Sequence, residues 1–245
     1  METDRLIKFL VREGQLLAAA AVEAGPEAPV PAFPGRQVRD LLRHIGTVHR
    51  WATAFITEGR THYRPADEQT ELDGDELVEW FREGHGLLVA ALSEAPADVE
   101  CWTFLPAPSP LAFWARRQAH ETALYRTDIE SAAAGKPGPV APDFAADGIA
   151  ELLTGFHGRS RLRSEAPRAL RVRPLDTDDV WTVWISTDTP RAEPMEEGPA
   201  DCELSGTAEQ LYLTLWNRLP LSAVSVTGDT ELAKLWREQS ALTEP

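Results

Sequence analysis

Residues 113–130 read FWARRQAHETALYRTDIE, a stretch without Gly or Pro that predicts a helix. With about 3.6 residues per turn, one ridge of this helix carries Arg117, Glu121, Tyr125 and Asp128. His120 lies on the neighbouring ridge. The residues alone leave two interpretations open: a solvated helix face with an ordinary ion pair between Arg117 and Glu121, or a ridge that carries chemistry.

The same stretch resembles the signature helix of the mycothiol-dependent maleylpyruvate isomerase family, within the DinB-like metalloprotein superfamily. The family pattern is close to R-x-x-x-H-E-x-x-x-H-R-x-D, and it matches Arg116, His120, Glu121, Arg126 and Asp128. In the family, the Glu and the second His bind a divalent metal, so the resemblance assigns Glu121 as a metal ligand. The second ligand His is replaced here by Tyr125, and a neutral phenol is a poorer zinc ligand than imidazole.

A second helix is predicted over residues 36–58, where an apolar stripe recurs at helical spacing. His49 falls inside the stripe and His44 on its flank, where a histidine is either a hydrogen-bonded boundary residue or a ligand. The segment VRDLLRHIGTVHRWA is similar to the family's second signature, D-L-L-x-H-I followed by V-H-R-W. The first His of that signature is a metal ligand, so the resemblance assigns His44 to this role. It gives His49 no definite role.

Two further helices are predicted, over residues 3–24, with Thr3 or Asp4 as N-cap, and over residues 75–95. Gly84 and Gly86 in the latter indicate close packing or a bend, and His85 between them is interpreted as a surface histidine or as part of a cleft. Proline-rich connections join the helices, and Trp102 and Phe104 on one of them are expected to cover an end of the bundle. The fold class expected for residues 1–135 is an all-α four-helix bundle of DinB-like type with a polar site inside.

Gly and Pro cluster in residues 132–143, AAAGKPGPVAPD, and predict a domain boundary. Residues 144–245 then read as a small α+β domain: one helix over 144–156, four strands within 169–176, 179–188, 200–206 and 223–229, and helices over 207–218 and 232–239. GTAEQLYLTLWNR and the V-x-G-D after it resemble the family's C-terminal domain, which has a sterol-carrier-like fold. A catalytic Arg of that domain matches Arg218. The alternative is that Arg218 only complements the dipole at a helix C-terminus.

Composition limits the partners. The 24 Lys and Arg against 39 Asp and Glu give a net charge of −15, which argues against nucleic acid or an anionic membrane. Cys101 and Cys202 lack metal or redox spacing and are expected to be buried free thiols. The sequence shows no signal peptide and no apolar run long enough for a membrane span, so a cytoplasmic location is expected.

Two functions follow from the resemblance. The first is a mycothiol-dependent isomerase or transferase that acts on a small electrophilic metabolite. A divalent metal, zinc being the expected one, is held by His44 and Glu121 and lowers the pKa of the bound thiol. Tyr125 acts as a weak ligand or as a general acid, and Arg218 holds a substrate carboxylate.

The second function is that of a metal-free family member, a small-molecule binding or non-metal catalytic module, because the usual ligand His is Tyr125. Its site would be a hydrogen-bonded cluster of His44, His120, Glu121 and Tyr125. A third histidine, His49 or His120, is the remaining candidate for the missing ligand.

Overall fold

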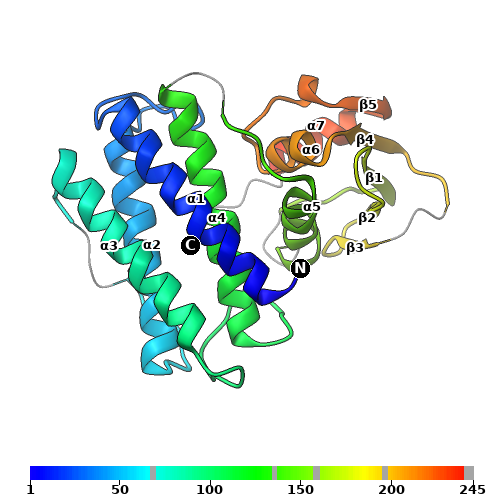
Figure 1. The fold of residues 1–245 in the computed structure, drawn as a ribbon. Helices are drawn as coiled ribbons and strands as arrows, with labels where there is room; N and C mark the ends of the chain where they lie inside the picture. The colour runs from blue at the N-terminus through cyan, green and yellow to red at the C-terminus, as the bar shows by residue number, and fades with distance from the viewer. Residues whose placement is uncertain (67–69, 134–136, 157–160, 195–197, 240–245) are drawn as a thin grey trace. The chain divides into compact units, whose positions relative to one another are not determined.

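The computed structural model describes residues 1–66, 70–133, 137–156, 161–194 and 198–239. The chain forms two compact units, Met1–Gly138 and Pro139–Pro245 (Figure 1). Each unit is described by itself below.

The first unit is a bundle of four helices that run side by side (Figure 1): α1 (Thr3–Ala24), α2 (Val38–Glu58), α3 (Gly74–Glu94) and α4 (Pro110–Ala133). α1 packs mainly on α4, and α2 mainly on α3. The expected bundle is therefore confirmed, with differences at the helix ends. The N-cap of α1 is Glu2 rather than Thr3 or Asp4, and α2 begins at Val38 because Gln37 and Asp40 form a capping box.

Two groups of side chains fill this bundle. A buried cluster between α1, α2, α3 and α4 includes Leu17, Leu41, Ile45, Phe81 and Ile129. A second group is aromatic. Phe55 of α2 stacks on Trp114 of α4 at 5.3 Å, and the Trp114 indole Nε1 donates to the carbonyl of Trp102, in the connection from α3 to α4. Trp102 and Phe104 pack together at 5.6 Å in this aromatic group, as expected.

Glycines on two helices permit close packing. A Cβ added to Gly84 would overlap the Arg50 guanidinium, and one added to Gly14 would overlap the His85 ring. Around Gly86, nothing lies within 4 Å of an added Cβ. The close packing expected in α3 thus occurs at Gly84 and not at Gly86.

These glycines give a matched pair of substitutions. Gly14→Ala is expected to destabilise the bundle by about 1–3 kcal/mol, because the imidazole beside it has to shift. Gly86→Ala is expected to stabilise it by up to about 1 kcal/mol, because the methyl group meets open space in a helix interior. Urea unfolding of both variants followed by circular dichroism measures the difference. Equal effects of the two substitutions would contradict the close contact at Gly14.

The second unit begins with α5 (Pro142–Ala150), which continues into a π-helical turn, η1 (Glu151–Gly155). Its sheet has the order β3-β2-β1-β4-β5, made of β1 (Arg168–Pro174), β2 (Trp181–Ile185), β3 (Arg191–Glu193), β4 (Cys202–Gly206) and β5 (Ser225–Gly228). β1 and β4 are parallel and the other neighbours are antiparallel. The expected α+β class is confirmed.

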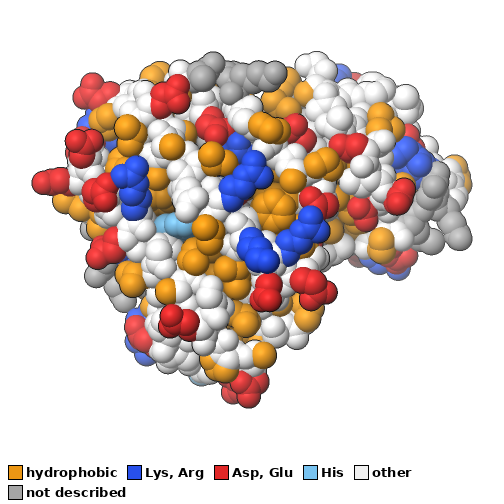
Figure 2. Space-filling model, viewed as in Figure 1, with side chains coloured by type: hydrophobic (Ala, Val, Ile, Leu, Met, Phe, Trp, Pro, Cys, Tyr) orange, Lys and Arg blue, Asp and Glu red, His pale blue; other side chains and the backbone are white. Residues whose placement is uncertain are grey.

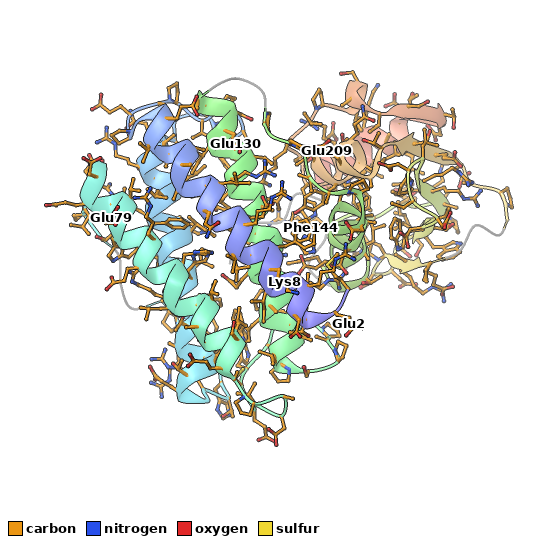
Figure 3. The ribbon with its side chains drawn as sticks, in the orientation of Figure 1. Glu2, Lys8, Glu79, Glu130, Phe144 and Glu209 are labelled. Carbon is orange, nitrogen blue, oxygen red and sulfur yellow. The ribbon has the colours of Figure 1, made fainter. Side chains whose placement is uncertain are left out.

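Three helical segments complete this unit: α6 (Ala208–Leu215), η3 (Leu221–Ala223) and α7 (Thr230–Gln239). α6 packs on α5, and α7 contacts β4 and β5. Glu209 of α6, labelled in Figure 3, accepts a hydrogen bond from the backbone N–H of Val140 at 2.8 Å. The sequence did not reveal β3, whose three residues are too short for an alternating pattern. The sequence predicts one continuous helix over 144–156. In the structure the α-helix changes to a π-helical turn at Glu151.

Candidate functional site

Helix α4 is buried around most of its circumference, although its sequence is polar. Its buried residues include Arg117, His120, Tyr125, Arg126 and Asp128. Arg117 is 4% exposed, Tyr125 5% and Asp128 2%, so the interpretation of this ridge as a solvated face is wrong. Buried polar groups need partners, and this helix is therefore where a polar site can form.

The structure brings His44 of α2 and Tyr125 of α4 together. Their rings stack with centroids 5.5 Å apart and an interplanar angle of 12°. The ring of Phe33, from the connection between α1 and α2, lies near-parallel to Tyr125 at 6.4 Å. His44 is half-buried, as expected for a residue on the flank of the apolar stripe. We call His44, Tyr125 and the neighbouring Glu121 the α2–α4 site.

Glu121 is part of the same ridge but has a cationic neighbour on its own helix. The Arg117 Nε lies 3.6 Å from the Glu121 Oε2, and the two side chains are 5% and 23% exposed. The expected i,i+4 pair is thus present in a mostly buried setting. A guanidinium beside this carboxylate competes electrostatically with any cation that the carboxylate would bind.

Further along α2, His49 is fully buried. Its Nε2 lies 2.9 Å from the Thr122 hydroxyl of α4, and its ring is 5.6 Å from His85 of α3. Burial lowers the pKa of His49 well below its usual value, and the charges of His85 and Arg50 lower it further. His49 therefore packs inside the bundle as a neutral imidazole that contacts the Thr122 hydroxyl.

His85 corrects one expectation from the sequence. It is 8% exposed, and its Nε2 lies 3.0 Å from the Leu10 carbonyl oxygen. Burial lowers the pKa of this histidine, partly offset by the hydrogen bond to Leu10. The interpretation of His85 as a surface residue is therefore wrong. Its ring can be buried because Gly14 on α1 has no side chain and leaves room for it.

Arg126, which matches the family signature, forms a buried ion network. Its Nε donates to Glu13 of α1 at 2.7 Å, and its Nη1 donates to Glu130 at 2.7 Å and to the Gly138 carbonyl at 2.8 Å (Figure 3 labels Glu130). The Gly138 N–H in turn donates to Glu130 at 2.8 Å. Arg126 thus ties α1 to α4 and fixes the chain beyond α4.

The described residues do not fit a resident metal with the usual three protein ligands. Among them, no group of three His, Cys, Asp or Glu side chains is arranged to hold a metal ion. At the ligand position of the signature, Tyr125 presents a ring stacked on His44 and Glu121 pairs with Arg117. Two donors of this kind are fewer than the three that catalytic zinc sites use.

The cysteines do not supply a nucleophile either. Cys101 and Cys202 are free and buried, as expected. Burial raises the pKa of the Cys202 thiol to about 11, and nearby Asp229 adds to the effect. Burial also raises the pKa of Cys101. A thiol of raised pKa is a weak nucleophile near neutrality.

Arg218 belongs to the second unit. The helix predicted over 207–218 ends earlier, at Leu215 of α6, so Arg218 lies just beyond it. The Arg218 N–H bonds to the Leu213 carbonyl at 2.7 Å, and the Asn217 N–H to the Thr214 carbonyl at 3.0 Å. Asn217 has φ 62°, the left-handed conformation that ends a helix in this Schellman pattern. The Arg218 Nη1 donates to the Trp216 carbonyl at 2.9 Å.

Three residues around the α2–α4 site and the bundle core were given no functional role from the sequence: Phe33, Thr122 and Glu13. Phe33 is the only aromatic residue in a connection rich in Pro and Gly. Glu13 stands at a helical-stripe position among leucines, which is a usable signal for a buried carboxylate. Thr122 carries no distinctive signal, because its partner is more than seventy positions away.

The fold and the site define a class: a four-helix bundle with a buried polar site, followed by a small α+β unit. Residues 10–130 match the family model described as the mycothiol maleylpyruvate isomerase N-terminal domain, and residues 143–235 match the MDMPI C-terminal domain. The chain belongs to the mycothiol-dependent maleylpyruvate isomerase family.

Two crystal structures are similar over 93% of this chain and 93% of their own. One is a mycothiol-dependent maleylpyruvate isomerase, with a TM-score of 0.62 and 13% identity. The other is a histidine-to-alanine mutant of mycothiol-dependent maleylpyruvate isomerase, with a TM-score of 0.63 and 12% identity. At this identity they establish the fold alone. A comparison with curated proteins gives no match.

The surface of the protein carries many acidic side chains. Acidic side chains are spread over the face shown in Figure 2, in line with the net charge of −15. No helix in the described part of the chain is long and apolar enough to cross a membrane.

Proposed function

We propose that this protein is a thiol-dependent isomerase or transferase that acts on a small electrophilic metabolite at the α2–α4 site, with mycothiol as the thiol. The observation that carries the proposal is the contact between His44 and Tyr125, two residues that fall at metal-ligand positions of the family signatures. Membership of a mycothiol-dependent family supports a thiol as co-substrate.

The chemistry is assigned to the chain's own side chains. Neutral imidazole is a general base near neutral pH, so His44 takes the proton of the thiol. The thiolate adds to the activated double bond, and the hydroxyl of Tyr125 donates a hydrogen bond to the oxygen that gains negative charge. Rotation about the resulting single bond and loss of the thiolate then give the isomer. A leaving group on the same carbon gives transfer instead.

Arg218 is proposed to bind a carboxylate of the substrate, because a guanidinium offers two parallel N–H donors. This assignment follows its match to the family's catalytic Arg.

Thiol-dependent turnover tests the proposal. Maleylpyruvate with mycothiol is the first substrate pair, followed by other α,β-unsaturated acids. Removal of a general base typically costs a factor of about 100 or more, so His44→Ala is expected to lower kcat at least that far. His62→Ala, at an exposed position, serves as the control. No thiol-dependent turnover with any of these acids, or full activity of His44→Ala, contradicts the proposal.

The second candidate function is the same reaction with a divalent metal, in which zinc would be held by only two protein ligands, His44 and Glu121. It is favoured by the same contact, because Tyr125 stands where the family has its second ligand His. Tyr125→His is expected to tighten zinc binding by at least about tenfold. Residues that only hydrogen-bond to a metal ligand already change metal affinity by that factor, and a third direct ligand contributes more. Equilibrium dialysis against zinc measures this for both proteins. No zinc binding by the native protein, or binding that is not weakened by His44→Ala, would contradict this candidate.

A further inference from the structure

The connection between α1 and α2 is a small hairpin that begins at Ala28. The Val38 N–H donates to the Ala28 carbonyl and the Val30 N–H to the Arg36 carbonyl, both at 3.0 Å. At the tip, the Phe33 N–H donates to Val30 and the Arg36 N–H to the Phe33 carbonyl. Gly35 completes the turn with φ 87°. The connection is therefore an ordered loop, and we call residues 28–38 the Phe33 loop.

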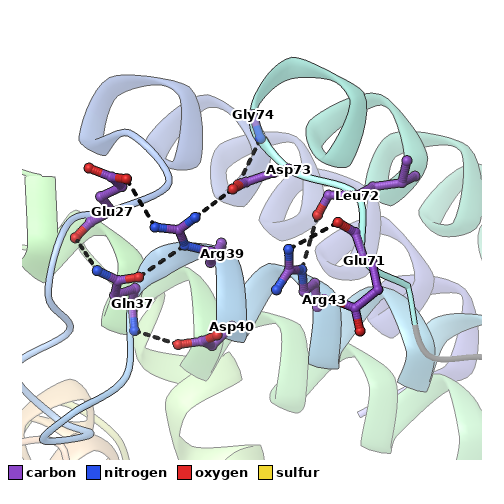
Figure 4. A network of polar contacts seen from close by, with 9 residues as sticks. All are labelled: Glu27, Gln37, Arg39, Asp40, Arg43, Glu71, Leu72, Asp73 and Gly74. Carbon is purple, nitrogen blue, oxygen red and sulfur yellow. Dashed lines mark hydrogen bonds and ion pairs between the residues drawn. The ribbon is translucent and has the colours of Figure 1, made fainter.

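The base of this loop is fixed by a polar network (Figure 4). Arg39 donates to Asp73 at 2.5 Å, to Glu27 at 3.2 Å and to the side chain of Gln37 at 2.9 Å. Gln37 donates to the Glu27 carbonyl at 3.2 Å, and its backbone N–H bonds to Asp40 at 2.9 Å. These contacts join both ends of the Phe33 loop to the starts of α2 and α3.

The tip of the loop carries one side chain toward the bundle. Pro31, Ala32 and Pro34 are exposed, whereas Phe33 is half-buried and packs on the buried cluster that contains Tyr125. The Phe33 ring lies 6.4 Å from the Tyr125 ring at 27°, and Tyr125 is only 5% exposed. Phe33 therefore shields a face of Tyr125 from solvent.

We propose that Phe33 controls ligand access to Tyr125 and His44 and favours flat, unsaturated ligands over saturated ones of the same length. The inference deepens the function proposed for the α2–α4 site and rests on it for the identity of that site. The Phe33 ring lies at 27° to the Tyr125 ring. An aromatic face beside the site packs more closely on a planar conjugated group than on a tetrahedral carbon chain. Because the loop is fixed at its base, this wall is present before a ligand binds.

Nitration of Tyr125 by tetranitromethane, followed by peptide mass spectrometry, tests access. Tyr63, 56% exposed, is an internal reference for reagent activity in each sample. Phe33→Ala is expected to speed nitration of Tyr125 several-fold relative to Tyr63, with a circular dichroism melting curve to establish that the bundle is folded. Pro31→Ala, an exposed change in the same loop, is expected to leave the rate unchanged. Should Phe33→Ala not fold, Phe33→Val supplies the same comparison. An unchanged Tyr125 rate in the folded variant overturns the proposal.

Protection of Tyr125 by maleate and by succinate tests the preference for flat ligands. In the native protein, maleate is expected to slow nitration at a lower concentration than succinate, and Phe33→Leu is expected to lose that difference while keeping the apolar bulk. Equal protection by the two acids, or none by either, overturns the preference. These outcomes are independent of turnover, so a failure of the proposed reaction is recognised separately, by the absence of thiol-dependent activity.

Discussion

Arg126→Ala is expected to destabilise the four-helix bundle by about 3–5 kcal/mol, because it leaves a buried carboxylate without its counter-charge. In the native protein, the side chains of Arg126 and Glu13 are 1% and 3% exposed and are joined at 2.7 Å. Without the guanidinium, Glu13 must bind a proton or open the α1–α4 contact. Glu130 and the Gly138 carbonyl lose the same donor.

Hydrogen exchange of peptides from α1 and α4, combined with urea unfolding, measures this loss within the bundle. The matched control is Arg82→Ala, which removes an exposed pair with Glu79, whose side chains are 49% and 69% exposed. Such surface pairs contribute about 0–1 kcal/mol. A double variant, Arg126→Met with Glu13→Leu, should recover much of the stability because it removes both charges. A loss for Arg126→Ala no larger than that for Arg82→Ala would contradict the buried network.

Acidification is expected to destabilise the bundle through His49 and His85, beginning near pH 6.5. Burial lowers the pKa of both histidines in the folded state. The unfolded chain, with histidine pKa values of about 6.5, then binds more protons than the folded chain. The stabilisation is complete above about pH 6.5 and is lost as the pH falls toward the lowered pKa values. Each histidine contributes a slope of up to about 1.4 kcal/mol per pH unit.

Unfolding free energies measured from pH 7 to pH 5 give this slope. His49→Gln with His85→Gln keeps a nitrogen donor near Thr122 and the Leu10 carbonyl but does not titrate, so the slope should flatten. His62→Gln, at an exposed position, should leave it unchanged. An unaltered slope in the double variant would mean that other groups carry the acid sensitivity.

The helices of the bundle were accessible from the sequence because their apolar residues recur at a period that only a helix satisfies. The stripe that runs from Val38 to Ile56 is the strongest example, and α2 has both of these residues buried. The residues at which helices begin and end were harder to predict from the sequence. Gln37 caps α2 through Asp40, and α6 stops at Leu215 because Asn217 adopts φ 62°, a local choice that the apolar pattern does not encode.

The α2–α4 site was predicted in part. The resemblance selected His44, Glu121 and Tyr125, and the structure places His44 against Tyr125. The sequence did not reveal that Phe33 would lie over Tyr125 or that His85 would be buried. The first depends on the position of the Tyr125 ring on another element, and the second on Gly14 of α1, which leaves room for the His85 ring. The metal on His44 and Glu121, and the role of Arg218, stay predictions.

By itself, the sequence determined the two-part organisation, the helical period of the bundle, the alternation of strands in the second part and the family of the chain. These properties are local, because each depends on residues within a few turns of one another. Only the tertiary structure decided which polar residues are buried. Arg126 pairs with Glu13, more than a hundred positions away in the sequence, and His49 contacts Thr122, more than seventy positions away. These partners offset the free-energy cost of burying a charged group and an imidazole.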